Sequence, residues 1–324
     1  MTLLSTFLID KAYEVLNSEV VLTPLITNEL INKELNAKIY FKLENFQYTG
    51  SFKIRGATYK ISLLSESERK KGIIAFSSGN HAQAVALASF KKKIKSTIIM
   101  PKNAPTIKIN KTKSYGADIL FYDQKEEDRK KIAEEISLKK GLTLIPPYDD
   151  INIITGQGTV GKEITEQLKL INIIPDVYLC CVGGGGLISG SSYYLKKNFP
   201  NLECYSVEPE NNHDTYLSLK KNSIIKINKT VNSICDSLTS ITQPGKITFN
   251  INRSILKEGL LVSDEEVKKA IKILYDKLKI VVEPGGAVAA AALFFKKIDI
   301  KNKIAVVMLS GGNIDRELFS KIIN

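Results

Sequence analysis

The chain has 324 residues, with 46 Lys or Arg against 34 Asp or Glu, which gives a formal net charge of +12. Its 44% of hydrophobic and 25% of charged residues are typical of globular proteins and exclude disordered and fibrous classes. At roughly 100–200 residues per domain, this length predicts about two domains. No apolar stretch approaches the ~20 residues of a membrane span, and the N-terminus lacks the basic start of a signal peptide. We therefore expect a cytoplasmic protein that does not enter membranes.

The positive charge does not by itself indicate a nucleic-acid partner. Only five of the 46 cationic residues are Arg, and the 41 Lys residues are spread along the whole chain. Proteins that contact bases and phosphates instead gather Arg on one element. The four cysteines (Cys180, Cys181, Cys204 and Cys235) form no C-x-x-C pair, and the two histidines lie far apart in the sequence. We therefore expect reduced, buried thiols and no zinc site.

Short apolar or β-branched segments alternate with amphipathic ones along most of the chain. We predict strands at 72–76, 96–100, 118–122, 177–182, 203–208 and 303–309. We predict helices at 81–90, 105–115, 125–139, 161–169 and 263–279. Ser263 is suited to cap the last of these, with three acidic residues in its first turn. The alternation predicts an α/β fold with two open, mostly parallel sheets, in which ligands bind at the carboxyl ends of strands.

Lys53 is the first residue in chain order whose setting indicates chemistry. It follows the turn residues Thr49-Gly50-Ser51 and lies between Phe52 and Ile54 at a predicted helix start. An apolar and electropositive site lowers the pKa of a lysine amine and favours the neutral form that attacks a carbonyl group. The alternative is a solvated surface charge, which is the ordinary state of a lysine in a chain that has 41 of them.

A second polar turn follows the strand predicted at 72–76. The segment Ser77-Ser78-Gly79-Asn80-His81-Ala82-Gln83 places hydroxyl, amide and imidazole side chains at the start of a predicted helix. Free backbone N–H groups at a helix N-terminus attract anions, so this turn is suited to hold a carboxylate. An ordinary helix cap needs fewer polar side chains than the five found here.

Two glycine-rich segments resemble nucleotide-binding motifs. Gly156 to Glu163 matches the P-loop pattern until Glu163, which occupies the place of the magnesium-binding Ser or Thr, so we interpret it as a turn into a helix. Gly183 to Gly186 follows a predicted strand, and four successive glycines let backbone N–H groups close on a phosphate. The segment Gly184-x-Gly186-x-x-Ser189, with Glu208 about twenty residues on, also approximates a dinucleotide fingerprint. A nicotinamide-dependent oxidoreductase is therefore an alternative.

In the order in which they occur, these motifs resemble those of the β-family (fold type II) of pyridoxal-phosphate (PLP) enzymes. The similarity is greatest to serine racemases and to short catabolic serine/threonine dehydratases. It extends from Leu22-Thr23-Pro24-Leu25 to Ser310-Gly311-Gly312-Asn313, which is nearly the whole chain. The resemblance implies a fold like that of the tryptophan synthase β subunit. It also implies a large PLP-binding domain (1–71 and 148–324) and a small mobile domain (72–147) that closes over the substrate.

The resemblance implies which residues would hold the cofactor. Lys53 would bind PLP as a Schiff base and would then act as a catalytic base. The glycines would bind the phosphate group, and Ser310 would face the pyridine nitrogen. The complete set of cofactor-binding residues would be Phe52, Lys53, Asn80, Gly183, Gly184, Gly185, Gly186, Leu187 and Ser310.

The resemblance also implies how the substrate would be bound and processed. Ser78 would be a second catalytic acid/base, because serine racemases carry Ser at a position where dehydratases confined to elimination often have Ala. Arg129 aligns with a residue that helps to hold the substrate carboxylate, although an exposed helix residue would look the same. The substrate-binding set would be Ser77, Ser78, Asn80, His81 and Arg129.

A divalent-cation site is a further implication of the similarity to serine racemases. Glu208 ends a predicted strand, Asp214 follows six residues later, and the backbone carbonyl of Asn212 would be a third oxygen ligand. Oxygen ligands of this kind suit Mg²⁺ or Ca²⁺. Each acid alone would be an ordinary surface carboxylate.

The function implied by the resemblance is that of a serine racemase with dehydratase activity towards L-serine or L-threonine. The products would be D-serine, or pyruvate and ammonia. A dedicated L-threonine/L-serine or threo-3-hydroxyaspartate ammonia-lyase is an alternative, and a catalytically silent amino-acid-binding module is another. The partners implied are an amino-acid substrate, a second copy of the chain in a homodimer, and ATP as an effector.

Overall fold

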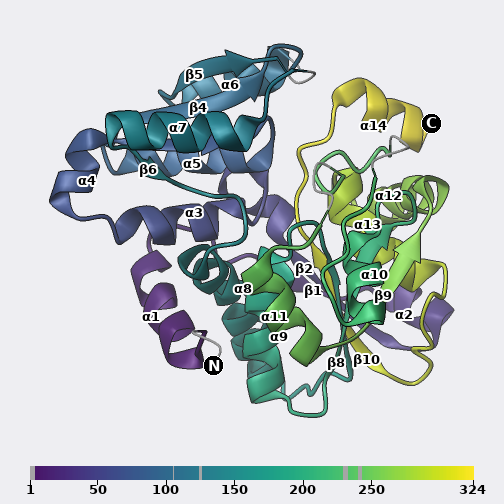
Figure 1. Ribbon diagram of the computed structural model, residues 1–324. Helices are drawn as coiled ribbons and strands as arrows, with labels where there is room; N and C mark the ends of the chain where they lie inside the picture. The colour runs from purple at the N-terminus through teal and green to yellow at the C-terminus, as the bar shows by residue number, and fades with distance from the viewer. Residues whose placement is uncertain (1–3, 105, 124–125, 229–232, 240–242) are drawn as a thin grey trace.

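The computed structural model of the protein describes residues 4–104, 106–123, 126–228, 233–239 and 243–324. Two sheets organise the chain and lie in different parts of the molecule (Figure 1). In spatial order, the larger sheet consists of β1 (Leu25–Ile26), β2 (Lys38–Leu43), β10 (Ile304–Leu309), β7 (Val177–Cys181), β8 (Glu203–Pro209) and β9 (Leu256–Val262). The smaller sheet consists of β5 (Asp118–Tyr122), β4 (Ser96–Pro101), β3 (Ile73–Phe76) and β6 (Thr143–Leu144).

Neighbouring strands in both sheets are parallel, except for the antiparallel pair β1 and β2. This arrangement confirms the predicted α/β fold with two mostly parallel sheets. The six predicted strands are all present, and their ends differ from prediction by at most one residue. The predictions did not include β2 and β9, nor the two-residue strands β1 and β6. In β2 the buried Lys42 hides the apolar pattern of a buried strand, and β9 is only partly buried, with Lys257 and Glu258 exposed.

Helices connect the strands and cover the sheets (Figure 1). Their bounds are α1 (Thr6–Leu16), α2 (Glu29–Leu35), α3 (Lys53–Ser62), α4 (Glu66–Lys71), α5 (Asn80–Lys91), α6 (Thr106–Ser114), α7 (Arg129–Lys140), α8 (Ile151–Leu170), α9 (Gly186–Asn198), α10 (Asp214–Lys221), α11 (Lys246–Ile255), α12 (Asp264–Leu278), α13 (Pro284–Phe294) and α14 (Arg316–Ile323), with short 3₁₀ turns η1 (Glu44–Phe46) and η2 (Tyr48–Gly50). Helices α5, α6 and α7 pack on the smaller sheet and form with it the smaller unit. Helices α12 and α13, with the α8–α9 pair, belong to the larger unit around the larger sheet. In the part of the chain that is described, no helix has both the length and the apolar character needed to cross a membrane.

Most predicted helices are present. Ser263 caps α12, accepting a hydrogen bond from the backbone N–H of Glu266, whose side chain in turn caps the Ser263 backbone. The predicted helix at 81–90 corresponds to α5. The helices predicted to begin at Pro105 and Lys125 correspond to α6 and α7, but those two residues lie outside the described part of the chain.

The interpretation of Gly156 to Glu163 as a turn was wrong, because the whole segment lies inside the 20-residue helix α8. Its glycines allow close packing between helices instead of a bend. A Cβ atom at Gly156 would lie 2.8 Å from the Cα atom of Gly56 on α3, and one at Gly161 would lie 2.6 Å from the carbonyl oxygen of Ser191 on α9. Helix α8 can therefore approach α3 and α9 more closely than side chains would allow.

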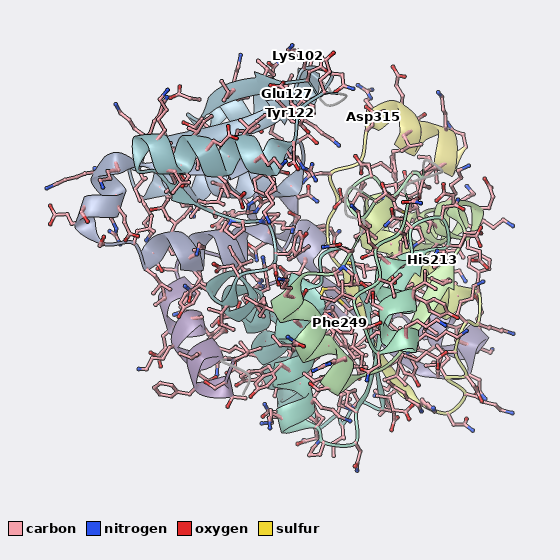
Figure 2. The ribbon with its side chains drawn as sticks, in the orientation of Figure 1. Lys102, Tyr122, Glu127, His213, Phe249 and Asp315 are labelled. Carbon is pink, nitrogen blue, oxygen red and sulfur yellow. The ribbon has the colours of Figure 1, made fainter. Side chains whose placement is uncertain are left out.

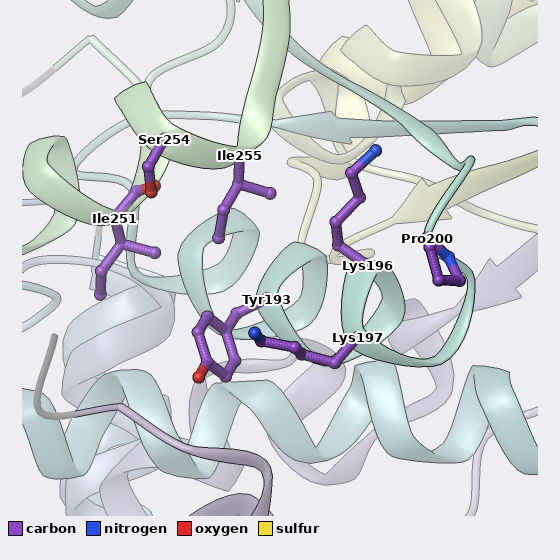
Figure 3. A pocket seen from close by; sticks show the side chains of 7 residues that line it. All are labelled: Tyr193, Lys196, Lys197, Pro200, Ile251, Ser254 and Ile255. Atoms are coloured by element: carbon purple, nitrogen blue, oxygen red, sulfur yellow. The ribbon is translucent and has the colours of Figure 1, made fainter.

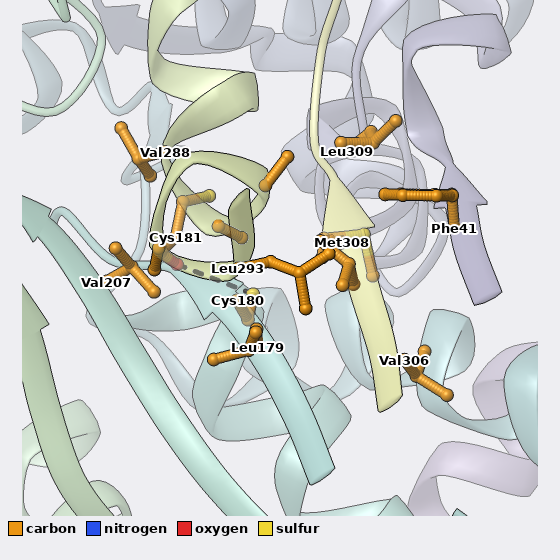
Figure 4. Packing of buried hydrophobic residues seen from close by; sticks show 14 of the residues in the cluster. Phe41, Leu179, Cys180, Cys181, Val207, Val288, Leu293, Val306, Met308 and Leu309 are labelled. Carbon is orange, nitrogen blue, oxygen red and sulfur yellow. Dashed lines mark hydrogen bonds between the residues drawn. The ribbon is translucent and has the colours of Figure 1, made fainter. Parts of the chain in front are cut away.

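The core of the larger unit lies around β7 and β10. Figure 4 shows side chains of this core, among them Phe41 from β2, Leu179 from β7 and Met308 from β10, which are fully buried. Each fully buried side chain of this kind contributes roughly 1.5–3 kcal/mol to folding. All four cysteines are buried and carry free thiols, which confirms the prediction. This rigid sheet fixes the strand ends on which the polar turns are built.

A separate apolar core lies beneath the smaller sheet, and it includes part of α3. Ile54, Ala57 and Ile61 of α3 pack with residues of the smaller sheet and of α5. Helix α3 also packs on α8. Since α3 contacts both parts of the molecule, the division of the chain at residues 72 and 147 stays a prediction.

Candidate active site

The carboxyl ends of strands from both sheets meet at one cavity of about 870 Å³. The turn after β3 carries Ser77, the loop after β7 carries Gly183, and Ser310 follows β10. All residues predicted to hold the cofactor or the substrate line this one cavity, although they come from segments up to 258 residues apart: Phe52, Lys53, Ser77, Ser78, Asn80, His81, Arg129, Gly183, Gly184, Gly185, Gly186, Leu187 and Ser310. The sheets therefore gather the separate motifs into a single site.

Lys53 is the first residue of α3, as predicted, and its ammonium points into the cavity wall. Its Nζ atom donates a hydrogen bond to the carbonyl oxygen of Pro147 at 2.7 Å and lies 5.1 Å from the centre of the Phe52 ring. Burial lowers the pKa of Lys53 from 10.5 to about 8, against smaller opposing effects of Cys181 and Glu283. A substantial fraction of the amine is therefore neutral near physiological pH, which is the form needed for attack on a carbonyl.

The loop from Gly183 to Gly186 connects β7 to the N-terminus of α9. Gly185 has a φ of +89°, a left-handed conformation that favours glycine. At Gly184 a Cβ atom would lie only 2.1 Å from the ring of Tyr148, so no larger residue fits beneath that ring. The first N–H groups of α9 have no partner within the helix, so they can together bind an anion. The loop thus has the geometry of a phosphate cradle.

The polar turn at the start of α5 lines the same cavity as this loop. Ser77 accepts a hydrogen bond from the backbone N–H of Gly79 at 3.1 Å. The amide of Asn80 is held on both sides: its Nδ2 donates to Glu283 at 2.6 Å, and its Oδ1 accepts from Asn313 at 2.8 Å. Ser78 is partly exposed to the cavity. Hydroxyl and N–H groups therefore remain available here for a carboxylate ligand.

His81 lines the cavity, but its ring forms a hydrogen bond with the backbone. The Nε2 atom lies 2.9 Å from the carbonyl oxygen of Ile145, so it must donate the proton in that hydrogen bond. Burial, with a smaller effect of the charge on Lys53, lowers the pKa of His81 to about 3. The imidazole is therefore neutral and offers no positive charge to a carboxylate.

Ser310 and Cys181 lie side by side at the ends of two neighbouring strands. The Cys181 thiol donates a hydrogen bond to the Ser310 hydroxyl oxygen at 3.2 Å, and both side chains are buried. Because the thiol supplies a donor to that oxygen, the hydroxyl hydrogen of Ser310 is free to point into the cavity. Arg129, the first residue of α7, faces the cavity from the smaller unit, with its guanidinium 5.9 Å from the centre of the Phe76 ring.

The predicted metal ligands lie together outside this cavity lining, at the end of β8. Glu208 and Asp214 are both buried, and burial raises the pKa of each, that of Asp214 to about 7. Asp214 Oδ1 accepts a hydrogen bond from Asn212 at 3.3 Å, whereas Oδ2 is buried and has no donor. In the described residues, no three His, Cys, Asp or Glu side chains gather at one point. A cation here would thus need backbone or water oxygens besides the two carboxylates.

The same geometry removes the basis for a dinucleotide site. The carboxylate of Glu208 accepts hydrogen bonds from the backbone N–H groups of Thr215 at 3.0 Å and Tyr216 at 2.6 Å. It therefore holds the start of α10, and Glu208 does not line the cavity to which the glycine loop belongs, as an acid that binds the ribose would have to do. His213, the second histidine, lies beside α10 on the larger unit, where its Nδ1 contacts the carbonyl oxygen of Glu210 (Figure 2).

Sequence reasoning missed several charged or polar residues of the cavity lining, among them Glu283, Asn313, Lys108 and Asp236. Glu283 directly precedes α13 and its side chain accepts a hydrogen bond from Asn80, and Asn313 joins Asn80 to the ammonium of Lys111. Lys108 on α6 forms an ion pair with Asp236 at 2.7 Å. The one sequence signal was the Glu283-Pro284 pair, because Pro is favoured in the first turn of a helix.

A second hollow lies on the surface of the larger unit, between α9 and α11 (Figure 3). Its lining includes Tyr193, Lys196 and Lys197 from α9 and Ile255 from α11. It contains none of the residues predicted to act in binding or catalysis. The chemistry-bearing side chains are thus concentrated in the first cavity.

Comparisons with known proteins agree with this site. A family model described as "Pyridoxal-phosphate dependent enzyme" matches residues 16–311. The chain is 43% identical to a serine racemase of Schizosaccharomyces pombe, covering 93% of this chain and 92% of that protein. It is 40% identical to an L-threo-3-hydroxyaspartate ammonia-lyase of Saccharomyces cerevisiae, covering 93% of this chain and 91% of that one. The crystal structure of serine racemase from Dictyostelium discoideum superposes with a TM-score of 0.88 at 35% identity, covering 96% of this chain and 99% of that chain. The chain therefore belongs to the family of pyridoxal-phosphate dependent enzymes.

Proposed function

We propose that the protein is a serine racemase that also eliminates water from L-serine, giving D-serine in one case and pyruvate with ammonia in the other. The observation that carries this proposal is that two groups able to move protons, Lys53 and Ser78, line the same cavity. A serine racemase is among the most similar relatives. A dedicated L-threonine/L-serine or threo-3-hydroxyaspartate ammonia-lyase is the second candidate, since relatives with these names match nearly as well.

The residues of the cavity fit PLP. The amine of Lys53 is suited to bind its aldehyde, and the loop from Gly183 to Gly186, where a Cβ atom would collide with Tyr148, is suited to its phosphate. Phe52, Asn80 and Leu187 would surround the ring, and the free hydroxyl hydrogen of Ser310 would face the ring nitrogen. When bound, PLP supplies an electron sink that makes the Cα proton of an amino acid acidic.

The protein's own groups would bind the substrate and transfer the protons. The substrate carboxylate would be bound by Ser77, Asn80 and the first N–H groups of α5, with Arg129 adding a positive charge from α7. His81 would bind the substrate carboxylate through its backbone N–H group and not through its neutral ring. Lys53 would take the Cα proton as general base. Racemisation needs a second acid, because a proton returned by Lys53 restores the L enantiomer, and Ser78 is suited to be that acid.

Replacement of Ser78 by Ala tests whether Ser78 is the second proton donor. We expect D-serine formation from L-serine to fall by at least ~10²-fold, while pyruvate formation persists, because only racemisation needs the second proton donor. Both products are measured in the same reaction. As a control, Ser77→Ala should lower both activities together, since Ser77 binds the substrate in either reaction. D-serine formation that survives in Ser78→Ala would remove Ser78 from the mechanism.

We also propose that Glu208, Asp214 and the carbonyl oxygen of Asn212 bind Mg²⁺ or Ca²⁺. The support is the buried Asp214 oxygen without a donor, next to a second buried carboxylate. EDTA is expected to lower the melting temperature by a few degrees, and Mg²⁺ to restore it, because the ion binds only the folded protein. Glu208→Gln should abolish this response, whereas Glu210→Gln, at an exposed neighbouring acid, should retain it. A melting temperature that EDTA leaves unchanged would count against the site.

Assembly, regulation and location complete the proposal. We propose a homodimer in the cytoplasm whose smaller unit closes over the substrate, with ATP as an effector. Support for the dimer comes from large apolar side chains that are exposed in the single chain. Phe46 and Tyr48 are 50% and 44% exposed, and Phe90 on α5 is 64% exposed. Tyr48 lies beside the end of α5, because the Lys91 ammonium is 4.3 Å from its ring centre.

A further inference from the structure

An ion pair crosses the cavity between the two units. Lys108 comes from α6 of the smaller unit, and Asp236 comes from the segment between α10 and α11 of the larger unit. The Lys108 Nζ atom and the Asp236 Oδ2 atom are 2.7 Å apart, and both residues line the cavity that contains Lys53. The Lys108 side chain is 25% exposed and the Asp236 side chain 62% exposed. Small ligands in the cavity can therefore compete for either partner.

The pair lies within electrostatic reach of the reacting centre. Burial raises the pKa of Glu283 to about 7, the hydrogen bond from Asn80 opposes this, and the charges on Asp236 and Lys108 act in opposite directions on the same carboxyl. Glu283 in turn acts on Lys53. The side of the cavity that holds Glu283 therefore also holds the ion pair.

The cations on this side already have hydrogen-bond partners. Lys108 is bound by Asp236, and the ammonium of Lys111 is bound by the amide oxygen of Asn313. An uncharged side chain, such as the hydroxymethyl group of serine, needs no ionic partner here. A β-carboxylate would instead face Asp236 and Glu283, and Lys108 would attract it only weakly, because Asp236 already offsets the charge of that ammonium.

We propose that Asp236 determines substrate specificity by holding the Lys108 ammonium, so that the cavity favours β-hydroxy amino acids with an uncharged β-substituent over 3-hydroxyaspartate. This inference rests on the proposed function, since it concerns the substrate of that same site. It also predicts what happens when Asp236 loses its charge. Lys108 then has no anionic partner, and its charge becomes available to a β-carboxylate.

The test compares wild type, Asp236→Asn, Lys108→Gln and the double variant. Asn keeps the size of Asp and an oxygen that accepts a hydrogen bond, so mainly the charge changes. The quantity measured is the ratio of kcat/KM for L-threo-3-hydroxyaspartate to that for L-serine. In wild type the ratio should be below one, and in Asp236→Asn it should rise by about tenfold or more, the effect of one charge-assisted hydrogen bond. The double variant should show no rise.

A matched control and a binding measurement complete the experiment. Glu134→Gln also removes one negative charge from the cavity lining and should leave the ratio within about twofold, because Glu134 is paired with Lys130 on its own helix. Binding of the unreactive dicarboxylate succinate to the PLP-bound enzyme, measured by calorimetry, should tighten in Asp236→Asn and not in the double variant.

Three results would overturn the inference: a wild type that prefers 3-hydroxyaspartate, an Asp236→Asn ratio equal to that of wild type, or a rise that persists without Lys108. Failure of the proposed function has a different signature. PLP-bound wild type would then form neither product from L-serine, and succinate binding would still test whether Asp236 controls Lys108.

Discussion

Replacing Arg55 with Met is expected to lower the free energy of unfolding by about 3–5 kcal/mol, because it leaves buried carboxylates without their cation. Arg55 is completely buried on α3, two residues after Lys53. Its guanidinium binds Glu44 at 2.8 Å and Glu163 at 2.7 Å. Glu163 is also paired with Lys42 at 2.7 Å. Two cations and two anions therefore balance inside the protein, and loss of Arg55 leaves one negative charge in excess.

The pKa directions agree with this account. Burial opposes the charged form of Glu44, yet Arg55 holds the pKa of Glu44 below its ordinary value. Burial likewise disfavours the charge on Arg55, and the two carboxylates raise its pKa. The cluster is thus stable only as a complete set, which is the usual behaviour of buried ion pairs. Because it joins β2, α3 and α8, it also fixes the start of α3, from which Lys53 enters the cavity.

Unfolding in urea, followed by circular dichroism, measures the effect. Arg316→Met is the matched control, because Arg316 is exposed at the first residue of α14 and its replacement should cost less than about 1 kcal/mol. Adding Glu163→Gln to Arg55→Met removes the excess negative charge and should recover part of the loss. If Arg55→Met were as stable as Arg316→Met, the cluster could not be what holds α3 in place.

The same cluster shows why sequence alone missed β2. With Lys42 inside it, the segment 38–43 does not look like a buried strand. Only the fold brings Glu163, which is 121 residues away, to Lys42. This contact offsets the free-energy cost of burying the Lys42 charge. In the sequence, Glu163 is the residue that departs from the P-loop pattern. In the structure, it belongs to this buried network. Interactions between distant residues of this kind leave no local pattern in a sequence.

Local patterns, by contrast, predicted the elements that carry the site. The apolar segment 177–182 followed by four glycines predicted a strand, a turn and a helix start, and the structure has β7, the loop and α9 there. The turn after β3 was predicted in the same way. Lys53 needed the family resemblance in addition, because one lysine among 41 has no distinguishing pattern. Glu283, Lys108 and Asp236 were missed, because their roles depend on how the two units face each other across the cavity.

Replacing Lys53 with Ala is expected to lower the rates of both racemisation and elimination by at least ~10³-fold, because the variant loses the general base of both reactions. It also loses the amine that binds PLP covalently. The wild-type protein should therefore be yellow with PLP and keep a borohydride-reducible link to it, whereas Lys53→Ala should not. Lys60→Gln is the matched control, since Lys60 lies on the same helix but outside the cavity, where it pairs with Asp150.

The pH dependence of PLP capture separates the role of Lys53 from that of other lysines. Because only the neutral amine attacks an aldehyde, the rate at which PLP-free protein turns yellow should rise with pH. With the pKa of Lys53 lowered to about 8, this rise should level off above that pH, after correction for free PLP. An ordinary lysine, with a pKa of 10.5, would give a rate that is still rising at pH 10. A continued rise, or a yellow Lys53→Ala variant with a reducible link, would show that PLP is captured by another amine.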